Sequence, residues 1–385
     1  MRTWVAARDA GAANILLPVL RKLQARPGVR LRVIAEGPAL RIFRGNGVAA
    51  EEAPAHPEEQ RNFLRGRWKE TAPEALLLGT SWGPSIEKEI LRIGQENGIP
   101  ALSVVDHWSH YRERFMEPGS GQVRLPNAIC VIDEIALEQA AAEGLPREIL
   151  RIAGQPHLQA LAARAGDPGL LQQARKLRAK WLGNSQDSKL ILFGSELFSD
   201  DFRRGTSHDR GYTETDALEG LAQALSAVEE RAGARVQLVV KLHPKEDRDR
   251  FRPGPLARSR GFLLAQSEPP WACLLAADAV VGMTSMLLVE GALLGRPAVS
   301  YQPEQGKAAF FIGTETGLVR SARTPEEIAV HLQELTADDR GGTVLAAEEV
   351  PRRGCGAAFR RRLLSGDAAA RIAELLLNLR EEVMK

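Results

Sequence analysis

Residues 278–299 read DAVVGMTSMLLVEGALLGRPAV, and this stretch contains in short form the fold that we expect for the whole chain. The apolar run Ala279–Val281 predicts a buried strand, and Met286–Leu294 predicts a helix that begins after a short turn. A second apolar run, Ala298–Tyr301, follows the helix. A strand, a helix and another strand in this order are typical of a parallel sheet with crossover helices.

The same alternation runs through the rest of the chain in two successive series. Short apolar runs predict the strands, and longer amphipathic stretches predict the helices between them. The expected strands are 3–7, 31–35, 75–78, 101–105, 128–132 and 149–152 in the first series and 190–193, 236–241, 262–265, 279–281 and 298–301 in the second. The expected helices include 15–24, 86–97, 135–143, 170–181, 216–231, 286–294 and 368–384.

The length of the chain and the restart of the pattern predict two domains. A chain of 385 residues exceeds the ~250 to 300 residues at which a single hydrophobic core stops growing. The pattern restarts after Gly154 and Pro156, which end a strand and begin a linker. We therefore expect an α/β protein with two Rossmann-like domains facing each other across a cleft. Their ranges are 1–155 and 156–365, and the remaining helix, within 366–385, is free to return to the first domain.

Composition and charge exclude several broad classes of protein. The 51 lysines and arginines nearly balance 49 aspartates and glutamates, and a net charge of +2 gives no general argument for nucleic-acid binding. No apolar run approaches the ~20 residues that span a bilayer, and the N-terminus lacks the pattern of a signal peptide. Three widely spaced cysteines suggest neither disulfides nor a metal site. We expect a cytoplasmic enzyme, with peripheral contact to the inner face of a membrane as an option.

The turn inside residues 278–299 is the first candidate site. At the start of the expected helix, unpaired backbone amides and the hydroxyl groups of Thr284 and Ser285 converge, which suits a diphosphate. Glu290 follows on the helix and reaches the hydroxyl groups of a ligand if the helix points at the cleft. The alternative is structural: Thr284 or Ser285 caps the helix, and Glu290 is a charge on its surface.

A second candidate site follows the strand expected at 236–241. Lys241 and His243 alternate along the chain and share one face of an extended strand, while Pro244 directs the chain out of the sheet. Both side chains could therefore donate charge-assisted hydrogen bonds to a phosphate or a uronate in the crevice. The alternative is a capped strand end, with a solvated Lys245 and a histidine packed on proline.

A third candidate site follows the strand expected at 190–193. Gly194 lets a ligand approach the backbone amides closely, and Ser195 adds a hydrogen-bond donor at the same sheet edge. The alternative is a plain turn from strand to loop.

A dense group of polar and aromatic side chains, DHWSHYRERF at 106–115, follows a strand in the first half. An aspartate or histidine at a strand end can remove a proton from an acceptor hydroxyl, and aromatic rings stack on sugar faces. Asp106 and His107 are therefore our candidates for the general base, and Trp108 is a candidate for contact with the acceptor. The alternative is a hydrogen-bonded loop that Trp108 anchors.

These motifs resemble those of the glycosyltransferase-B superfamily. The stretch 278–299 is similar to the donor-binding segment of lipid A disaccharide synthase-like and capsule glycosyltransferases, and of non-hydrolysing UDP-N-acetylglucosamine 2-epimerases. The Lys-x-His-Pro element at 241–244 also resembles that of capsule and teichoic-acid transferases. The resemblance implies phosphate contacts for Thr284 and Ser285 and a ribose contact for Glu290. It also implies that the loop of Gly194 and Ser195 faces the donor pyrophosphate.

The resemblance places the acceptor near the loop after the first strand, residues 9–14 with the sequence DAGAAN. Gly11 and Asn14 are the candidates in this loop, although two alanines stand where the family has glycines. Ser81 ends another strand of the first half and is a further candidate for the acceptor side. The alternative for the first loop is a tight turn into a helix.

The function that the resemblance implies is transfer of a sugar from a nucleotide-activated donor to a hydroxyl of a carbohydrate or lipid-linked acceptor, in surface polysaccharide or glycoconjugate biosynthesis. We expect no metal and no cofactor, because no DxD pair in a strand context and no His/Cys cluster at ligand spacing is evident. Three alternatives remain: a UDP-sugar 2-epimerase, a phosphotransferase that uses a CDP-polyol donor, and a nucleotide-sugar-binding protein without activity.

Overall fold

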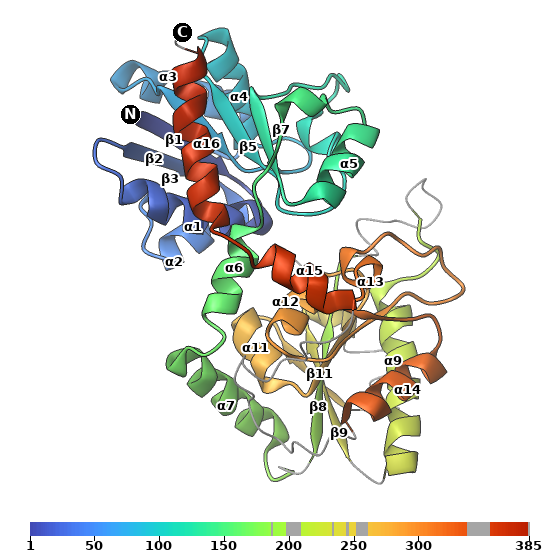
Figure 1. Ribbon diagram of the computed structural model, residues 1–385. Coiled ribbons are helices and arrows are strands. Elements are labelled where there is room, and N and C mark those ends of the chain that lie inside the picture. The colour runs from blue at the N-terminus through green and yellow to red at the C-terminus, as the bar shows by residue number, and fades with distance from the viewer. Residues whose placement is uncertain are drawn as a thin grey trace. The chain divides into compact units, whose positions relative to one another are not determined.

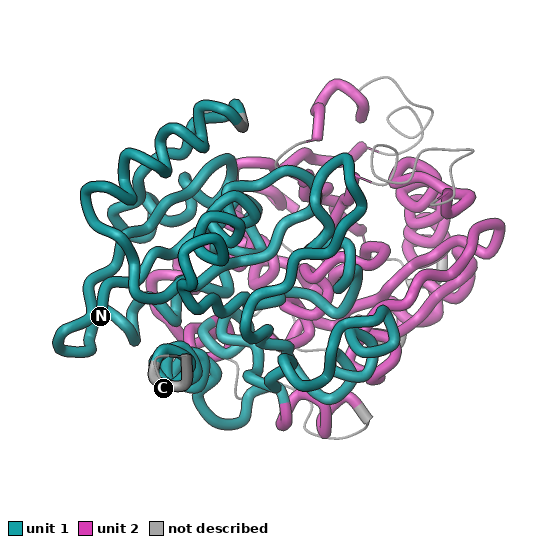
Figure 2. Tube along the Cα trace, turned by 90° about the horizontal axis from the view of Figure 1, so that it is seen from above, with its two compact units in different colours: residues 1–160, 363–385 teal, residues 161–362 magenta. Residues whose placement is uncertain are grey.

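The chain forms two compact units in the computed structural model (Figures 1 and 2). The structure describes residues 1–185, 188–197, 209–232, 235–243, 246–251, 261–336 and 355–383. Unit 1 contains Met1–Ala160 and Leu363–Lys385, and unit 2 contains Leu161–Arg362. Unit 1 is therefore built from two separate segments of the chain, and the whole of unit 2 lies between them in the sequence.

Unit 1 contains a sheet of seven strands in the order β3-β2-β1-β4-β5-β6-β7, and every pair is parallel. Its central strands are buried on both faces, which explains why they read as continuous apolar runs. The strands are β1 (Arg2–Ala7), β2 (Arg30–Ala35), β3 (Ala50–Glu52), β4 (Ala75–Leu78), β5 (Ala101–Val104), β6 (Ala128–Val131) and β7 (Leu150–Ile152).

Helices cover both faces of this sheet, and side chains alternate along each strand between the two faces. On one face, Val5 of β1 belongs to a core that includes α1 (Ala10–Gln24), α2 (Gly37–Gly45) and α16 (Ala368–Val383). On the other, Trp4 belongs to a core with α3 (Pro57–Glu70) and α4 (Ile86–Glu96). Figure 1 shows α16, in red, lying across the sheet beside α1. The remaining helices of this part are α5 (Glu134–Ala142), the 3-10 turns η1 (Glu113–Phe115) and η2 (Arg147–Ile149), and α6 (Pro156–Ala163), which runs on into unit 2.

Unit 2 contains a second parallel sheet, of six strands, in the order β10-β9-β8-β11-β12-β13. The strands are β8 (Lys189–Gly194), β9 (Val236–Lys241), β10 (Phe262–Ala265), β11 (Ala279–Gly282), β12 (Ala298–Tyr301) and β13 (Arg320–Ala322).

Helices also cover both faces of the second sheet. Helices α9 (Glu214–Ala232) and α14 (Pro325–Thr336) share a core with Phe193 and Val281 on one face. On the other face, Gly291 of α12 (Met286–Leu293) lies against Val280 and against Leu274 of α11 (Pro270–Ala276). The other helices are α7 (Pro168–Leu182), the 3-10 turn η3 (Arg248–Phe251), α13 (Ile312–Glu315) and α15 (Cys355–Leu363).

Both sheets reverse their strand order at one point, between β1 and β4 in unit 1 and between β8 and β11 in unit 2. In parallel α/β sheets, ligands bind at the carboxyl ends of the strands on either side of such a switch point. The expected α/β class with two Rossmann-like units is confirmed. The strand order therefore marks one edge in each unit where a site is expected.

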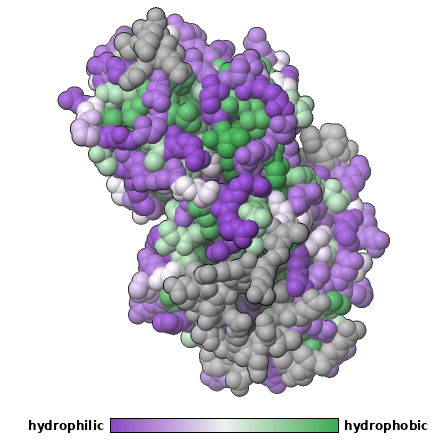
Figure 3. Space-filling model, viewed as in Figure 1, coloured by the Kyte–Doolittle hydropathy of each residue, from purple (hydrophilic) through white to green (hydrophobic). Residues whose placement is uncertain are grey.

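Hydrophilic and hydrophobic residues are interspersed on the face of the molecule that Figure 3 shows. Large apolar side chains that are well exposed occur singly, as Trp82, Phe310 and Val330 do. No helix in the described part of the chain combines the length and the apolar character needed to cross a membrane.

Candidate functional site

The switch point of unit 2 brings the ends of β8 and β11 together. Gly282 ends β11 so close to β8 that a Cβ atom there would lie 3.0 Å from the carbonyl oxygen of Gly194. Residues 283–285 then turn into α12, and Ser285 is the N-cap, with its hydroxyl accepting a hydrogen bond from the Leu287 amide at 3.2 Å. Ser285 therefore caps α12, as the alternative for this residue predicts. The amides of residues 283 and 284 take no part in this cap.

A carboxylate from the loop that follows β8 occupies this turn. Glu196 accepts hydrogen bonds from the Met283 amide at 3.2 Å, the Thr284 amide at 2.8 Å and the Thr284 hydroxyl at 2.9 Å. Burial raises the pKa of Glu196 to about 7, while the hydrogen bonds from Thr284 act in the opposite direction. The turn that the sequence indicates for a phosphate thus holds a carboxyl group that the protein itself supplies. Sequence reasoning missed Glu196, although it directly follows Ser195.

The ends of β8 and β9 are joined through a second buried carboxylate. Glu246 accepts a hydrogen bond from the Ser195 hydroxyl at 2.6 Å and another from the His243 amide at 2.5 Å. Burial raises the pKa of Glu246 to about 7. Glu246 is a further residue that the sequence did not single out. Pro244 and Lys245, which belong to the same motif, lie outside the described residues.

Lys241 lies at the same sheet edge with its side chain almost fully buried. Its ammonium donates to the carbonyl oxygen of Gln266 at 2.8 Å, and the Gln266 amide group donates in turn to the carbonyl oxygen of Glu246 at 2.9 Å. Burial lowers the pKa of the Lys241 ammonium. A chain of hydrogen bonds therefore links the carboxyl ends of β8, β9 and β10, and Lys241 is the cation within it.

Glu290 lies on α12, one helix turn beyond the cap. Its side chain is half-buried and accepts a hydrogen bond from the indole nitrogen of Trp271 at 3.2 Å. This bond fixes the orientation of the carboxylate that the resemblance assigns to a ribose.

The corresponding edge of unit 1 holds Asp106 in a fixed position. A Cβ atom on residue 11 would lie 1.7 Å from the Oδ2 atom of Asp106, so only glycine leaves room for this carboxylate at the start of α1. The other oxygen, Oδ1, accepts a hydrogen bond from Arg114 at 2.6 Å. Arg114 is buried and also donates to the Thr80 hydroxyl at 2.9 Å. Asn14 is half-buried on the same helix and, three residues after Gly11, shares its face.

The loop after Asp106 is held by hydrogen bonds and by the burial of Trp108. Burial lowers the pKa of His107 to about 4, against the effect of Asp106, so the imidazole is neutral at pH 7; its Nδ1 atom lies 2.9 Å from the Ser109 hydroxyl. His110 has a φ of 56°, a left-handed value that is rare outside glycine. Trp108 is 1% exposed and donates to Asp133 at 3.0 Å, so its ring anchors the loop and presents no face to a sugar.

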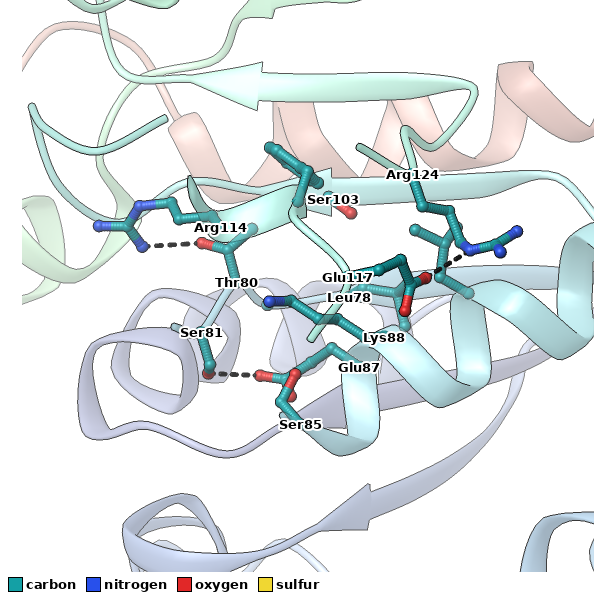
Figure 4. A pocket seen from close by; sticks show the side chains of 13 residues that line it. Leu78, Thr80, Ser81, Ser85, Glu87, Lys88, Ser103, Arg114, Glu117 and Arg124 are labelled. Carbon is teal, nitrogen blue, oxygen red and sulfur yellow. Dashed lines mark hydrogen bonds and ion pairs between the residues drawn. The ribbon is translucent and has the colours of Figure 1, made fainter. Parts of the chain in front are cut away.

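A pocket opens beside Ser81 at the carboxyl ends of β4 and β5 (Figure 4). Ser81 donates to Glu87 at 2.7 Å, and Ser85, Glu87 and Lys88 extend into the pocket from the start of α4. Arg114 lines the opposite wall and connects the pocket to Asp106. The lining residues are Leu78, Gly79, Thr80, Ser81, Ser85, Glu87, Lys88, Leu91, Ser103, Arg114, Phe115, Glu117 and Arg124.

The structure therefore groups the predicted residues into two sets, one in each unit. Unit 2 holds Gly194, Ser195, Lys241, His243, Thr284, Ser285 and Glu290, and unit 1 holds Gly11, Asn14, Ser81, Asp106, His107 and Trp108. Within the described ranges, no group of three histidine, cysteine, aspartate or glutamate side chains is placed to hold a metal ion.

Comparison with known proteins bears on the fold. No family model and no curated protein matches the sequence. Among solved structures, the chain is similar to the UDP-GlcNAc 2-epimerase from Neisseria meningitidis bound to UDP-GlcNAc, with a TM-score of 0.67 and 14% identity over 98% of this chain and 100% of that chain. The UDP-GlcNAc 2-epimerase from Methanocaldococcus jannaschii has a TM-score of 0.62 and 11% identity over 95% and 100%.

A glycosyltransferase belongs to the same group of similar structures. The glycotransferase of kitacinnamycin has a TM-score of 0.58 and 16% identity, and the match covers 98% of each chain. These similarities extend over nearly the whole of every chain compared, and they confirm the expected resemblance to the glycosyltransferase-B fold.

Proposed function

We propose that this protein is a glycosyltransferase that uses a nucleotide sugar as donor. The observation that supports the proposal best is the anion-binding turn at the switch point of unit 2, where Met283 and Thr284 donate three hydrogen bonds to a carboxylate. A phosphate oxygen accepts from the same kinds of donor, and helix N-termini at switch points are common phosphate sites. Solved structures of this fold contain UDP-GlcNAc, which supports a nucleotide-sugar ligand.

In the proposed reaction, the oxygen of an acceptor hydroxyl forms a bond to the anomeric carbon, and the bond from that carbon to the donor phosphate breaks. The hydroxyl proton passes to Asp106, and the nucleoside diphosphate leaves with the electron pair. Negative charge grows on the leaving phosphate, so the turn at 283–285 and the cation of Lys241 stabilise the transition state. Asp106 is the candidate that we favour, because its carboxylate is held in a fixed position at the start of α1, whereas the Nδ1 atom of His107 lies 2.9 Å from the Ser109 hydroxyl.

Epimerisation of a UDP-sugar is the second candidate function. Such a reaction needs carboxylates around the sugar ring to remove and return a proton. Asp106 and Glu87 are both held at the carboxyl edge of the sheet of unit 1, and two of the similar structures described above are 2-epimerases. The two reactions differ in their products, which makes them easy to separate.

The test is incubation with a panel of radiolabelled nucleotide sugars and separation of the products. Transfer releases a free nucleoside diphosphate, whereas epimerisation leaves the donor intact with an isomerised sugar. We expect Asp106→Asn to lower turnover at least about 100-fold without weakening nucleotide binding. Glu138→Gln, which removes an exposed carboxylate of α5, is the control. Full turnover by Asp106→Asn would exclude Asp106 as the base, and an isomerised donor without diphosphate release would exclude transfer.

A further inference from the structure

Two buried polar atoms in the pocket of unit 1 have no hydrogen-bond partner among the described residues. They are the Ser85 hydroxyl oxygen and the Oε2 atom of Glu87, in residues that are 4% and 3% exposed. Both residues line the same pocket, at the first turn of α4 (Figure 4). Because buried polar groups in folded proteins are nearly always paired, two unpaired atoms in residues that line one pocket indicate a group that binds there.

Neither atom contributes a hydrogen bond to the fold among the described residues. Ser85 stands at the N-cap of α4, but its side chain makes no capping bond, and the Ile86 amide donates to Glu36 at 2.9 Å instead. Glu87 is fixed through its other oxygen, Oε1, which accepts from the Ser81 hydroxyl at 2.7 Å and from the Arg8 amide at 2.9 Å. The protein thus orients the Glu87 carboxylate through one oxygen and leaves the second for another partner.

The charges around the pocket restrict what can bind. Lys88 donates to two main-chain carbonyl oxygens, each at 2.8 Å, and its ammonium carries a third N–H. Lys88 and Arg114 disfavour a cationic ligand, and Glu87 disfavours an anionic one. A neutral hydroxyl group satisfies the site, because it donates to Glu87 and accepts from Ser85 or Lys88.

The size of the cavity restricts the ligand further. Its volume is about 10 Å³, which is room for one group of the size of a water molecule. The pocket therefore takes the end of a ligand and leaves the body of the ligand outside. Arg114 donates to Asp106 at 2.6 Å, so a ligand anchored here lies next to the carboxylate that we propose as the base.

We propose that the pocket formed by Ser85, Glu87 and Lys88 binds a hydroxyl group of a sugar or polyol acceptor. Calling the ligand an acceptor rests on the proposed function. The pocket would then recognise a second hydroxyl group of the acceptor, in addition to the hydroxyl that reacts. Hydroxyl binding itself depends only on the residues of unit 1.

The experiment measures saturation transfer by NMR from the intact protein to ribitol and to N-acetylglucosamine. We expect signals from at least one of them with the unchanged protein, and an apparent dissociation constant at least about fivefold higher with Ser85→Ala and with Glu87→Gln. Glu87→Gln preserves the shape of the side chain and places an amide group where an acceptor stood. Glu89→Gln is the matched control, because this substitution makes the same charge change two residues further along α4. Glu89 pairs with Arg92 and does not line the pocket.

Three results would overturn the inference. The first is that the unchanged protein transfers no saturation to ribitol or to N-acetylglucosamine. The second is that Ser85→Ala and Glu87→Gln bind these compounds with the same affinity as the unchanged protein does, which would leave water as the occupant of the pocket. The third is an equal loss in Glu89→Gln. Thermal shift with UDP in the same samples reports on the proposed function separately. If the protein binds UDP but no polyol, nucleotide binding is retained as a proposal and only the hydroxyl site in unit 1 is excluded.

Discussion

At the residue scale, Glu196 matters most to the proposed donor site, because it accepts the hydrogen bonds that we propose for a donor phosphate. A phosphate and this carboxylate cannot share the Thr284 amide, and two anions at that distance repel each other. If the turn binds a nucleotide as we propose, Glu196 has to move away from the Thr284 amide or take up a proton. We therefore propose that Glu196 limits how strongly this turn holds a diphosphate.

We predict that Glu196→Gln binds UDP at least about fivefold more tightly than the unchanged protein, which corresponds to about 1 kcal/mol of removed repulsion. Isothermal titration with UDP and with inorganic pyrophosphate measures the effect. Glu230→Gln is the control, because Glu230 is an exposed carboxylate of α9 in the same unit. Weaker binding by Glu196→Gln would show that Glu196 supports the ligand and does not compete with it.

Glu246 makes the stability of unit 2 depend on pH. Burial raises its pKa from 4.5 in the unfolded chain to about 7 in the folded protein, so the folded state holds the proton more tightly. The resulting stabilisation is complete below pH 4.5 and is lost as the pH rises through 7. The shift corresponds to about 3 kcal/mol between those limits.

We therefore expect the free energy of unfolding to fall more steeply with pH, between about 4.5 and 7.5, in the unchanged protein than in Glu246→Gln. Urea unfolding at several pH values measures both slopes. Glu196 has a similar pKa and is present in both proteins, so the difference between the slopes isolates Glu246. An equal change of the unfolding free energy with pH in both proteins would contradict the raised pKa of Glu246.

At the scale of elements, α16 closes part of the core of unit 1. It packs in the same core as α1, and Leu376 within it is fully buried. We predict that Leu376→Ala destabilises unit 1 by roughly 2–5 kcal/mol, the usual cost of a cavity in a core. Hydrogen exchange should rise in β1, β4 and β5 and stay unchanged in β8 and β9. Asn378→Ala, on the exposed side of α16, should change neither set of strands.

Short strands with mostly apolar residues could be predicted from the sequence, both where they are buried throughout, as β4 and β12 are, and at the sheet edge, as in β10. The bounds expected for β4, β9, β10 and β12 agree with the structure, because these strands are short apolar runs between polar turns. Elements without such a pattern were missed: α3 is highly charged, α2 begins with Gly-Pro, and β3 reads AEE at the edge of the sheet.

The parts of the site that were missed depend on contacts between distant strand ends. Glu196 and Thr284 are 88 residues apart, and Ser195 and Glu246 are 51 residues apart, yet each pair is joined by a hydrogen bond. The spacing of residues along one strand or helix carries no information about such pairs. Only the strand order β9-β8-β11 shows that their loops lie side by side.

At the scale of the whole molecule, the order of the segments matters most. Residues 161–362 form unit 2, and they interrupt unit 1 between its sheet and its last helix. The sheet of unit 1 and α16 are thus far apart in the sequence but share one hydrophobic core.

During synthesis on the ribosome, this arrangement delays the completion of the core of unit 1. Its seven strands emerge first, but residues 363–383 follow only after all of unit 2 has been made, which takes about 10–40 s at ordinary rates of synthesis. During that interval the apolar surface that α16 later covers is open to the solvent and to other nascent chains. The newly made protein therefore exposes this apolar surface for longer than a chain whose domains are completed one after the other.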